Sequence, residues 1–163
     1  MKERMIESVC PKCHHTFWIK RDTLIIAGIH PLVQERLEDG TYFMHRCSQC
    51  HTLYQIQQPL LYRNPEQGFI LALTASTNIP SFPEEKEVIV CRSPEDFLFC
   101  FKVKEQGLNL SLVKKKKKQL EHREGCSLRF DTYDETNHCL WFLNKQKPIG
   151  IRLSLQEQSE IIQ

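Results

Sequence analysis

The stretches Cys10-Pro11-Lys12-Cys13 and Cys47-Ser48-Gln49-Cys50 organise this chain of 163 residues. They are two C-x-x-C pairs, and 33 residues separate one pair from the other. Each pair can form a tight knuckle that directs both sulfur atoms at one ion, and four thiolates in a tetrahedral arrangement suit Zn²⁺. The pattern therefore predicts one structural zinc ion held by four ligands, Cys10, Cys13, Cys47 and Cys50.

Two other interpretations of these cysteines stay open. A mononuclear iron or iron–sulfur site would use the same ligands, although zinc is the commoner occupant of paired knuckles. Paired reduced thiols without a metal are the second alternative. A thioredoxin-like redox motif would explain one C-x-x-C pair, but not two pairs that each lead into an apolar strand.

Histidines near the cysteine pairs suggest a mixed ligand set as a further alternative. His14 and His51 each follow the second cysteine of a pair directly, and His15 and His45 are close by. The position after a knuckle often needs a positive φ, which glycine adopts freely and histidine tolerates better than most residues. We therefore interpret His14 and His51 as turn residues rather than as ligands.

Composition and charge are those of an ordinary globular protein. Hydrophobic residues make up 40% and charged residues 26%, which excludes a wholly disordered or fibrous chain. The 22 lysines and arginines against 20 acidic residues give a net charge of +2, and each side of Ala75 carries +1, so no half is strongly basic. The apolar run at residues 69–73 is too short to span a bilayer. The charged residues 1–7 are not followed by the apolar segment of a signal peptide. We expect a cytoplasmic protein whose eight cysteines are reduced.

Apolar periodicity and turn residues predict mainly β-structure in the first half. Residues 16–27 indicate two strands interrupted near residues 20–22. Pro31 at a first-turn position and Gly40 at a C-cap position bound a short helix. The other predicted strands are residues 41–46 and 53–57, around the second cysteine pair, and 60–62 and 69–74, joined by a hairpin turn at 63–68.

The second half mixes helices and strands. Serine, asparagine and proline content predicts a linker at residues 76–87. Ser93-Pro94-Glu95-Asp96 has N-cap chemistry, which predicts a buried helix over residues 94–106. The later predicted elements are a strand at 88–91, a helix at about 108–124, strands near 126–130, 139–143 and 149–155, a turn at 134–137 and a frayed tail at 156–163.

These elements predict an α+β protein. A zinc-ribbon-like β lobe with a short inserted helix would occupy residues 1–75, and the linker at 76–87 would lead into an α+β half at residues 88–163. That half would hold a helix pair and a C-terminal antiparallel β hairpin or meander. The two halves form either separate domains or one packed unit.

The order of motifs resembles the bacterial and archaeal CpXC family, which is named for C-P-x-C motifs and has no assigned biochemical activity. The resemblance is specific over Val9 to Thr74. In this stretch, Cys-Pro-Lys-Cys is followed by an aromatic strand, by a helix that ends in Leu-Glu-Asp-Gly-Thr-Tyr-Phe, and by the second C-x-x-C pair. The segments Pro59-Leu60-Leu61-Tyr62 and Gly68-Phe69-Ile70-Leu71 come next. It implies that the four knuckle cysteines are the family's metal ligands. The second pair departs from the motif because it has no proline, and neither pair is followed by the usual glycine.

The four remaining cysteines are interpreted as small buried hydrophobic residues, because each has apolar neighbours and none has knuckle spacing. They are Cys91, Cys100, Cys126 and Cys139. His138 precedes Cys139, but neighbours on a strand point to opposite faces, so the two are not predicted to form a catalytic pair. The sequence has no glycine-rich phosphate loop and no serine–histidine–aspartate motif. It predicts a protein that is not an enzyme, with catalysis by an unpaired cysteine as the alternative.

A run of five lysines is the second distinctive feature of the sequence, and it comprises Lys114, Lys115, Lys116, Lys117 and Lys118. A solvated helix face explains such a run most simply. A contact with phosphates or with an acidic partner is the functional alternative.

The sequence favours a non-enzymatic, zinc-stabilised binding or adaptor protein with a protein partner, no membrane association and no small-molecule substrate. The alternative is a zinc-dependent RNA- or DNA-binding protein that uses the zinc lobe together with the lysine run at residues 114–118.

Overall fold

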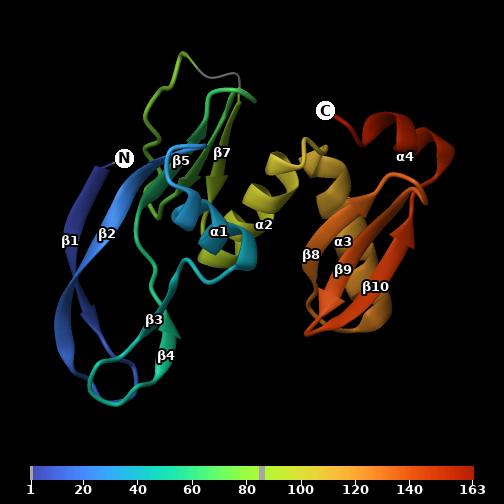
Figure 1. Cartoon of the computed structure of the whole chain (residues 1–163). Helices are drawn as coiled ribbons and strands as arrows, with labels where there is room; N and C mark the ends of the chain where they lie inside the picture. The colour runs from blue at the N-terminus through green and yellow to red at the C-terminus, as the bar shows by residue number, and fades with distance from the viewer. Residues whose placement is uncertain (1, 85–86) are drawn as a thin grey trace. The chain divides into compact units, whose positions relative to one another are not determined.

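The computed structural model describes residues 2–84 and 87–163, and the chain divides into two compact units, Met1–Leu98 and Phe99–Gln163 (Figure 1). Both units mix helices and strands, so the predicted α+β class is confirmed. Within the described residues, no helix is both long enough and apolar enough to cross a membrane.

A mixed five-stranded sheet forms the frame of the first unit, in the order β1-β2-β5-β6-β7. The pairs β1–β2 and β5–β6 are antiparallel, whereas β2–β5 and β6–β7 are parallel. A separate two-stranded ribbon contains β3 and β4. The strands are β1 (Lys2–Val9), β2 (Thr16–Ile26), β3 (Met44–Arg46), β4 (Leu53–Gln55), β5 (Leu60–Asn64), β6 (Phe69–Leu73) and β7 (Glu87–Cys91).

The predicted short helix and hairpin of this unit are both present. Helix α1 (Pro31–Asp39) begins with its proline and ends at Gly40, whose φ of 81° is in the left-handed region that glycine adopts without a steric penalty. In the β5–β6 hairpin, Asn64 Oδ1 accepts a hydrogen bond from the Gln67 N–H at 3.0 Å, which stabilises the predicted turn.

One face of the sheet carries the core of the first unit. Tyr62 on β5 and Leu71 on β6 are paired and both fully buried. Gln34 of α1 donates to the Tyr62 hydroxyl at 3.2 Å, so α1 covers this face. Phe43 and Phe97 make an edge-to-face contact with ring centroids 5.6 Å apart.

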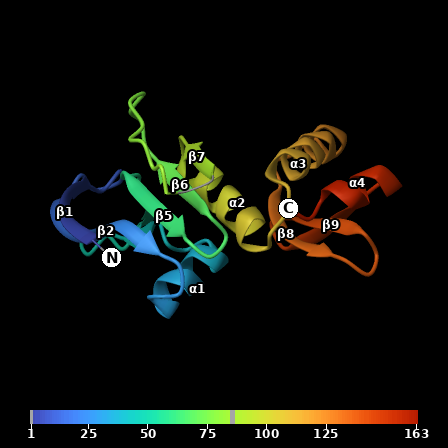
Figure 2. The same cartoon turned by 90° about the horizontal axis from the view of Figure 1, so that it is seen from above.

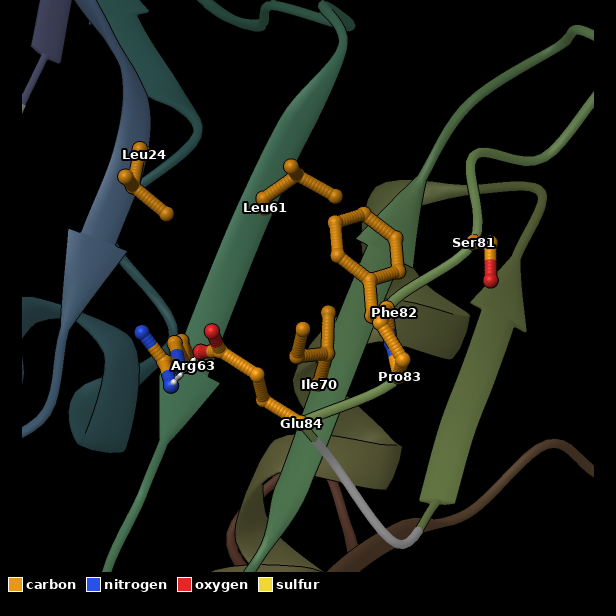
Figure 3. A pocket seen from close by; sticks show the side chains of 8 residues that line it. All are labelled: Leu24, Leu61, Arg63, Ile70, Ser81, Phe82, Pro83 and Glu84. Carbon is orange, nitrogen blue, oxygen red and sulfur yellow. Dashed lines mark hydrogen bonds and ion pairs between the residues drawn. The ribbon is translucent and has the colours of Figure 1, made fainter.

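The opposite face of the sheet is covered by the segment that leads to β7. Phe82 and Pro83 face Leu61 and Ile70 across a shallow hollow of about 250 Å³ (Figure 3). At the rim of this hollow, Arg63 forms an ion pair with Glu84 at 3.2 Å.

The predicted division of the chain differs from this arrangement. Strand β7 belongs to the first unit, because it pairs with β6 through Ile70↔Val88 and Leu71↔Ile89. Residues 81–84 of the predicted linker lie against the sheet, and residues 85 and 86 of that linker fall outside the described residues. Because helix α2 (Pro94–Glu105) runs from one unit into the next, the boundary falls inside a helix and has no linker composition.

The second unit contains the predicted β meander, a three-stranded antiparallel sheet in the order β10-β9-β8. Helix α3 lies along one face of this sheet (Figures 1 and 2). Leu112, Val113 and Leu120 of α3 share a buried cluster with Phe130, Leu140 and Phe142 of the sheet. The elements are α3 (Leu110–Glu124), β8 (Arg129–Asp134), β9 (Cys139–Asn144), β10 (Lys147–Arg152) and α4 (Leu155–Glu160).

Two local predictions are wrong, and one strand was not predicted. Residues 16–26 form one continuous strand, since β1, which was not predicted, pairs with β2 through the expected interruption. The tail at 156–163 is ordered rather than frayed, because Ser154 and Glu157 form a capping box that starts α4. Ile161 is 1% exposed, and its carbonyl accepts a hydrogen bond from the Asn109 N–H at 2.7 Å.

Candidate metal centre

Each cysteine pair lies at the tip of an antiparallel ribbon. The first pair connects β1 to β2, and the second connects β3 to β4. The two knuckles have the same backbone hydrogen bonds: His14 N–H donates to Cys10 O at 3.0 Å, and His51 N–H donates to Cys47 O at 2.9 Å. Because Ser48 replaces proline without changing this pattern, the second knuckle does not need proline to form.

The residue after each knuckle has the backbone conformation predicted for it. His14 and His51 both have a φ of 61°, in the left-handed region that glycine favours. The interpretation of these two histidines as turn residues is therefore confirmed, and neither belongs to the cluster of candidate ligand atoms.

The four knuckle sulfurs converge. All lie within 4.8 Å of one another, and Sγ–Sγ distances of 3.6 Å join Cys10 to Cys50 and Cys13 to Cys47. A tetrahedral ion with metal–sulfur bonds of about 2.3 Å requires sulfurs about 3.8 Å apart, whereas a disulfide requires about 2.05 Å. The arrangement therefore fits a single metal ion and not a disulfide pair.

The four candidate ligands differ in their burial and in the hydrogen bonds to their sulfurs. Cys10 and Cys47 are fully buried, whereas Cys50 is half-buried and Cys13 is exposed. Thr52 Oγ1 lies 3.2 Å from Cys50 Sγ, where its hydroxyl can donate to a thiolate. The Gln49 N–H donates to Cys47 Sγ at 3.4 Å. Each sulfur of the second knuckle therefore has a hydrogen-bond donor beside it, which is the Thr52 hydroxyl for Cys50 and the Gln49 N–H for Cys47.

The pKa values of the thiols follow the same division. The Thr52 hydroxyl and then its backbone N–H lower the pKa of Cys50 to about 6. The Cys50 N–H is the main group that lowers the pKa of Cys47. A backbone hydrogen bond from His15 acts to lower the pKa of Cys13, but desolvation of its sulfur among the other three and hydrogen bonds with the neighbouring thiols raise it to about 12. The second knuckle is therefore the part of the site that supplies thiolates most readily.

An aromatic cluster holds the two ribbons together beside the sulfurs. Phe17 of β2 stacks on His45 of β3 with ring centroids 4.8 Å apart, and the Tyr54 ring of β4 meets Phe17 edge-on at 6.4 Å. The Tyr54 hydroxyl lies 3.0 Å from the Ser8 hydroxyl of β1. These contacts position one knuckle against the other, and they account for the inward-facing aromatic residues of the lobe.

The other face of the β1–β2 ribbon carries three exposed apolar side chains around the exposed Glu7. Met5, Val9 and Trp18 are 55%, 52% and 63% exposed. Trp18 pairs with Glu7, between Met5 and Val9 on the same face of β1. We call these three residues the ribbon patch.

The remaining cysteines lie away from the metal centre. Cys91 and Cys100 are fully buried and Cys139 is 9% exposed, as predicted, whereas Cys126 is half-buried against the core of the second unit. Burial raises the pKa of Cys139, which is the opposite of what a reactive thiolate needs.

The lysine run lies on α3, in the second unit, whereas all four knuckle cysteines belong to the first. Its side chains have different environments. Lys114, Lys115 and Lys118 are exposed, Lys117 is half-buried, and Lys116 is 8% exposed.

Thr52 is a part of this site that no motif of the sequence indicated. Position 52 lies two residues after the second knuckle, where the first knuckle has His15, and no spacing rule distinguishes the two. A hydroxyl residue just after a C-x-x-C pair is the signal that could have been used, since thiolates accept such hydrogen bonds.

Comparison with known proteins agrees with the geometry. No curated protein and no solved structure matches the chain. A family model described as CpXC protein matches residues 9–129, which include both knuckles and extend into β8. The chain, with its four converging knuckle cysteines, therefore belongs to the CpXC family.

Proposed function

We propose that this protein is a non-enzymatic binding module whose first unit is stabilised by one zinc ion. The convergence of four cysteine sulfurs from two separate ribbons is the observation that carries this proposal. Four soft thiolate ligands suit Zn²⁺, which has no geometric preference of its own and accepts the tetrahedral arrangement. The two knuckle-bearing ribbons would then form a lobe of zinc-ribbon type.

The role assigned to the metal is thermodynamic. Four protein ligands complete a tetrahedral zinc site and leave no position for a water molecule or a substrate, which is the pattern of structural rather than catalytic zinc. The knuckle segments offer little apolar core of their own, and a structural zinc ion contributes on the order of 10 kcal/mol to folding. On this basis the ion fixes the register of the two ribbons and so shapes the surface beside them.

The partner that best fits this surface is an extended segment of another protein. Strand β1 is at the edge of the sheet, and its eight residues can pair with one added strand. Trp18 and Met5 of the ribbon patch would contact apolar side chains of that strand, since aromatic residues and methionine are enriched in protein interfaces. The Glu3–Lys20 ion pair at 2.7 Å gives the patch a polar border.

Elemental analysis tests the zinc part of the proposal. The purified protein should contain about one zinc per chain, and Cys47→Ser should lose most of it. Cys126→Ser is the matched control, because it removes a half-buried cysteine outside the knuckles and should leave the zinc content unchanged. A zinc content near zero in a protein with an intact fold would overturn the proposal.

Affinity capture tests the partner surface. Nuclease-treated extracts should yield a protein that binds the wild-type chain and is lost with Trp18→Lys. Leu155→Lys places the same charge on another exposed apolar residue, which is 85% exposed in the second unit, and should retain that partner. Equal capture by both variants would remove the ribbon patch as the docking surface.

Thiol labelling tests the alternative of catalysis by an unpaired cysteine. A catalytic cysteine outside the metal centre would react rapidly with iodoacetamide in the folded, zinc-loaded protein. Slow labelling of Cys91, Cys100 and Cys139 is expected because all three are buried, and rapid labelling of any one of them would favour a catalytic cysteine.

A further inference from the structure

The structure divides the lysine run into two groups. Lys116 Nζ lies 2.7 Å from Glu157 Oε2, and Lys117 Nζ lies 3.0 Å from Glu121 Oε1 and 5.5 Å from the centre of the Phe99 ring. These two lysines neutralise carboxylates of their own unit. Lys114, Lys115 and Lys118 are exposed, and none of the three forms an ion pair with any residue that the structure describes.

The exposed surface of α3 is therefore basic and polar throughout. Its exposed residues before the last position of the helix are Ser111, Lys114, Lys115, Lys118, Gln119, His122 and Arg123. The last residue, Glu124, is the one exposed acid of α3, and it pairs with Arg123 at 3.1 Å. We call Lys114, Lys115 and Lys118 the free lysine triad.

The unit that carries the triad is itself basic. Residues 99–163 contain 12 lysines and arginines against 8 aspartates and glutamates, so the net charge is 12 − 8 = +4. Residues 1–98 contain 10 against 12, so the net charge is 10 − 12 = −2. A division after Ala75 hides this asymmetry, because the structural boundary lies 23 residues further along the chain.

The helix places the triad charges close together. Lys114 and Lys118 are four residues apart and Lys115 and Lys118 three apart, so their Cβ atoms are neighbours on one helix surface. Like charges at these spacings repel one another and destabilise a helix. A polyanion bound to this surface would relieve that repulsion.

We propose that the free lysine triad binds the phosphate backbone of a duplex nucleic acid without reading its base sequence. A protein partner fits this surface less well, because stable protein interfaces contain buried apolar or aromatic anchors and the exposed residues of α3 include none. A single strand also fits less well, because such strands are held by stacking on aromatic side chains. Clustered lysines on a helix surface whose exposed residues include no phenylalanine, tyrosine or tryptophan suit the paired phosphate backbone.

This inference does not rest on the proposed function, because the triad and the metal centre belong to different units. It differs from a zinc-dependent nucleic-acid site, since it assigns no contact to the knuckles. Zinc content and nucleic-acid binding can therefore be measured on the same protein, and either can fail without the other.

Counterion release sets the expected size of the effect. Three phosphate contacts give a slope of log Kobs against log salt of about −2.7 for a duplex. Affinity should therefore fall roughly 40-fold when the salt concentration rises from about 50 to about 200 mM. At physiological salt, Kd should lie in the non-specific range of about 1–100 μM.

Fluorescence anisotropy with a labelled duplex DNA of about 20 base pairs tests the proposal on the full zinc-loaded chain. The double variant K114E/K118E should bind at least about 10-fold more weakly, with a salt slope near −1. K114R/K118R retains both charges and should bind as the wild type does. A thermal melt should show that K114E/K118E is at least as stable as the wild type, since it removes like-charge repulsion.

The matched control separates a local contact from a general effect of charge. K145E/K147E makes the same change of net charge at two exposed positions of the same unit, one in the β9–β10 turn and one at the start of β10, and should bind the duplex with little loss. Equal weakening by K145E/K147E, no measurable binding at about 50 mM salt, or a preference for polyglutamate over the duplex would each overturn the proposal.

Discussion

Lys116 of α3 and Glu157 of α4 form an ion pair of 2.7 Å, and both side chains are largely buried, with 11% and 14% exposure. Glu157 also accepts the Ser154 N–H through Oε1 at 2.9 Å, which completes the capping box of α4. One carboxylate therefore starts the last helix and fastens it to α3.

Loss of Lys116 should destabilise the second unit. Lys116→Met keeps the apolar stem of the side chain but leaves the Glu157 carboxylate without its cation, at an expected cost of about 1–2 kcal/mol. Lys115→Met changes the exposed neighbouring lysine and should shift stability by less than about 0.5 kcal/mol. Urea unfolding measures both variants, and equal stability of the two would show that the ion pair contributes nothing.

The same pair predicts a dependence of stability on pH. Burial acts to raise the pKa of Glu157, but hydrogen bonds from Lys116 and Ser154 hold it below the ordinary glutamate value. A carboxyl whose folded pKa is depressed contributes stability that is present above its unfolded pKa of about 4.3 and is lost as the pH falls through the folded pKa. The stability difference between wild type and Glu157→Gln should therefore be constant near neutral pH and shrink below about pH 4.3. A difference that stayed unchanged down to the acid unfolding transition would contradict this.

The Thr52 hydroxyl should strengthen metal binding through Cys50. Thr52→Val removes the donor 3.2 Å from Cys50 Sγ, and loss of such a supporting contact typically lowers metal affinity by about 10–100-fold. Because the hydroxyl lowers the pKa of Cys50, the variant should also release zinc at a higher pH, where protons begin to compete for the thiolate. Zinc competition with a chromophoric chelator at several pH values measures both effects. Thr52→Ser keeps the hydroxyl and should behave as the wild type.

His14 and His51 should tolerate glycine and reject β-branched residues. Both have a φ of 61°, where an L-residue is strained by roughly 1–2 kcal/mol. Glycine relieves this strain but makes the unfolded chain more flexible, so His51→Gly should change stability by less than about 1 kcal/mol. His51→Ile should destabilise the zinc-loaded protein by more than about 1 kcal/mol. The reverse order in a thermal melt would show that the ring of His51 has a role beyond the turn.

Gly150 should not accept a side chain. A Cβ atom there would lie 2.8 Å from Cys139 Sγ and 2.9 Å from the ring of Trp141, its partner on β9. Gly150→Ala should therefore destabilise the meander by about 1–3 kcal/mol through overpacking. The double variant Gly150→Ala/Trp141→Leu makes room for the methyl group and should recover part of the loss. Full stability of Gly150→Ala alone would show that Trp141 moves aside freely.

The features that were predicted correctly are those set by residues close together in the sequence. The caps of α1, the β5–β6 turn and the positive φ of both histidines were predicted, because proline, glycine and the knuckle restrict φ within a few residues. Strand β1 was missed because it alternates weakly and is stabilised by pairing with β2. The tail is ordered despite its polar composition, because Ser154 and Glu157 form a capping box and Ile161 is buried.

The two C-x-x-C pairs alone identify the four candidate metal ligands and the family, because each motif sets the spacing of its own two sulfurs within four residues. Contacts in the folded chain set which unit β7 joins, which hydroxyl lies beside Cys50, and which lysines have no ion-pair partner among the described residues. Lys116 is buried and paired because Glu157, 41 residues further along the chain, lies beside it. Strand β7 belongs to the first unit because it pairs with β6. Contacts between distant segments are set by packing and by strand pairing, and periodicity within a segment carries no information about its partner.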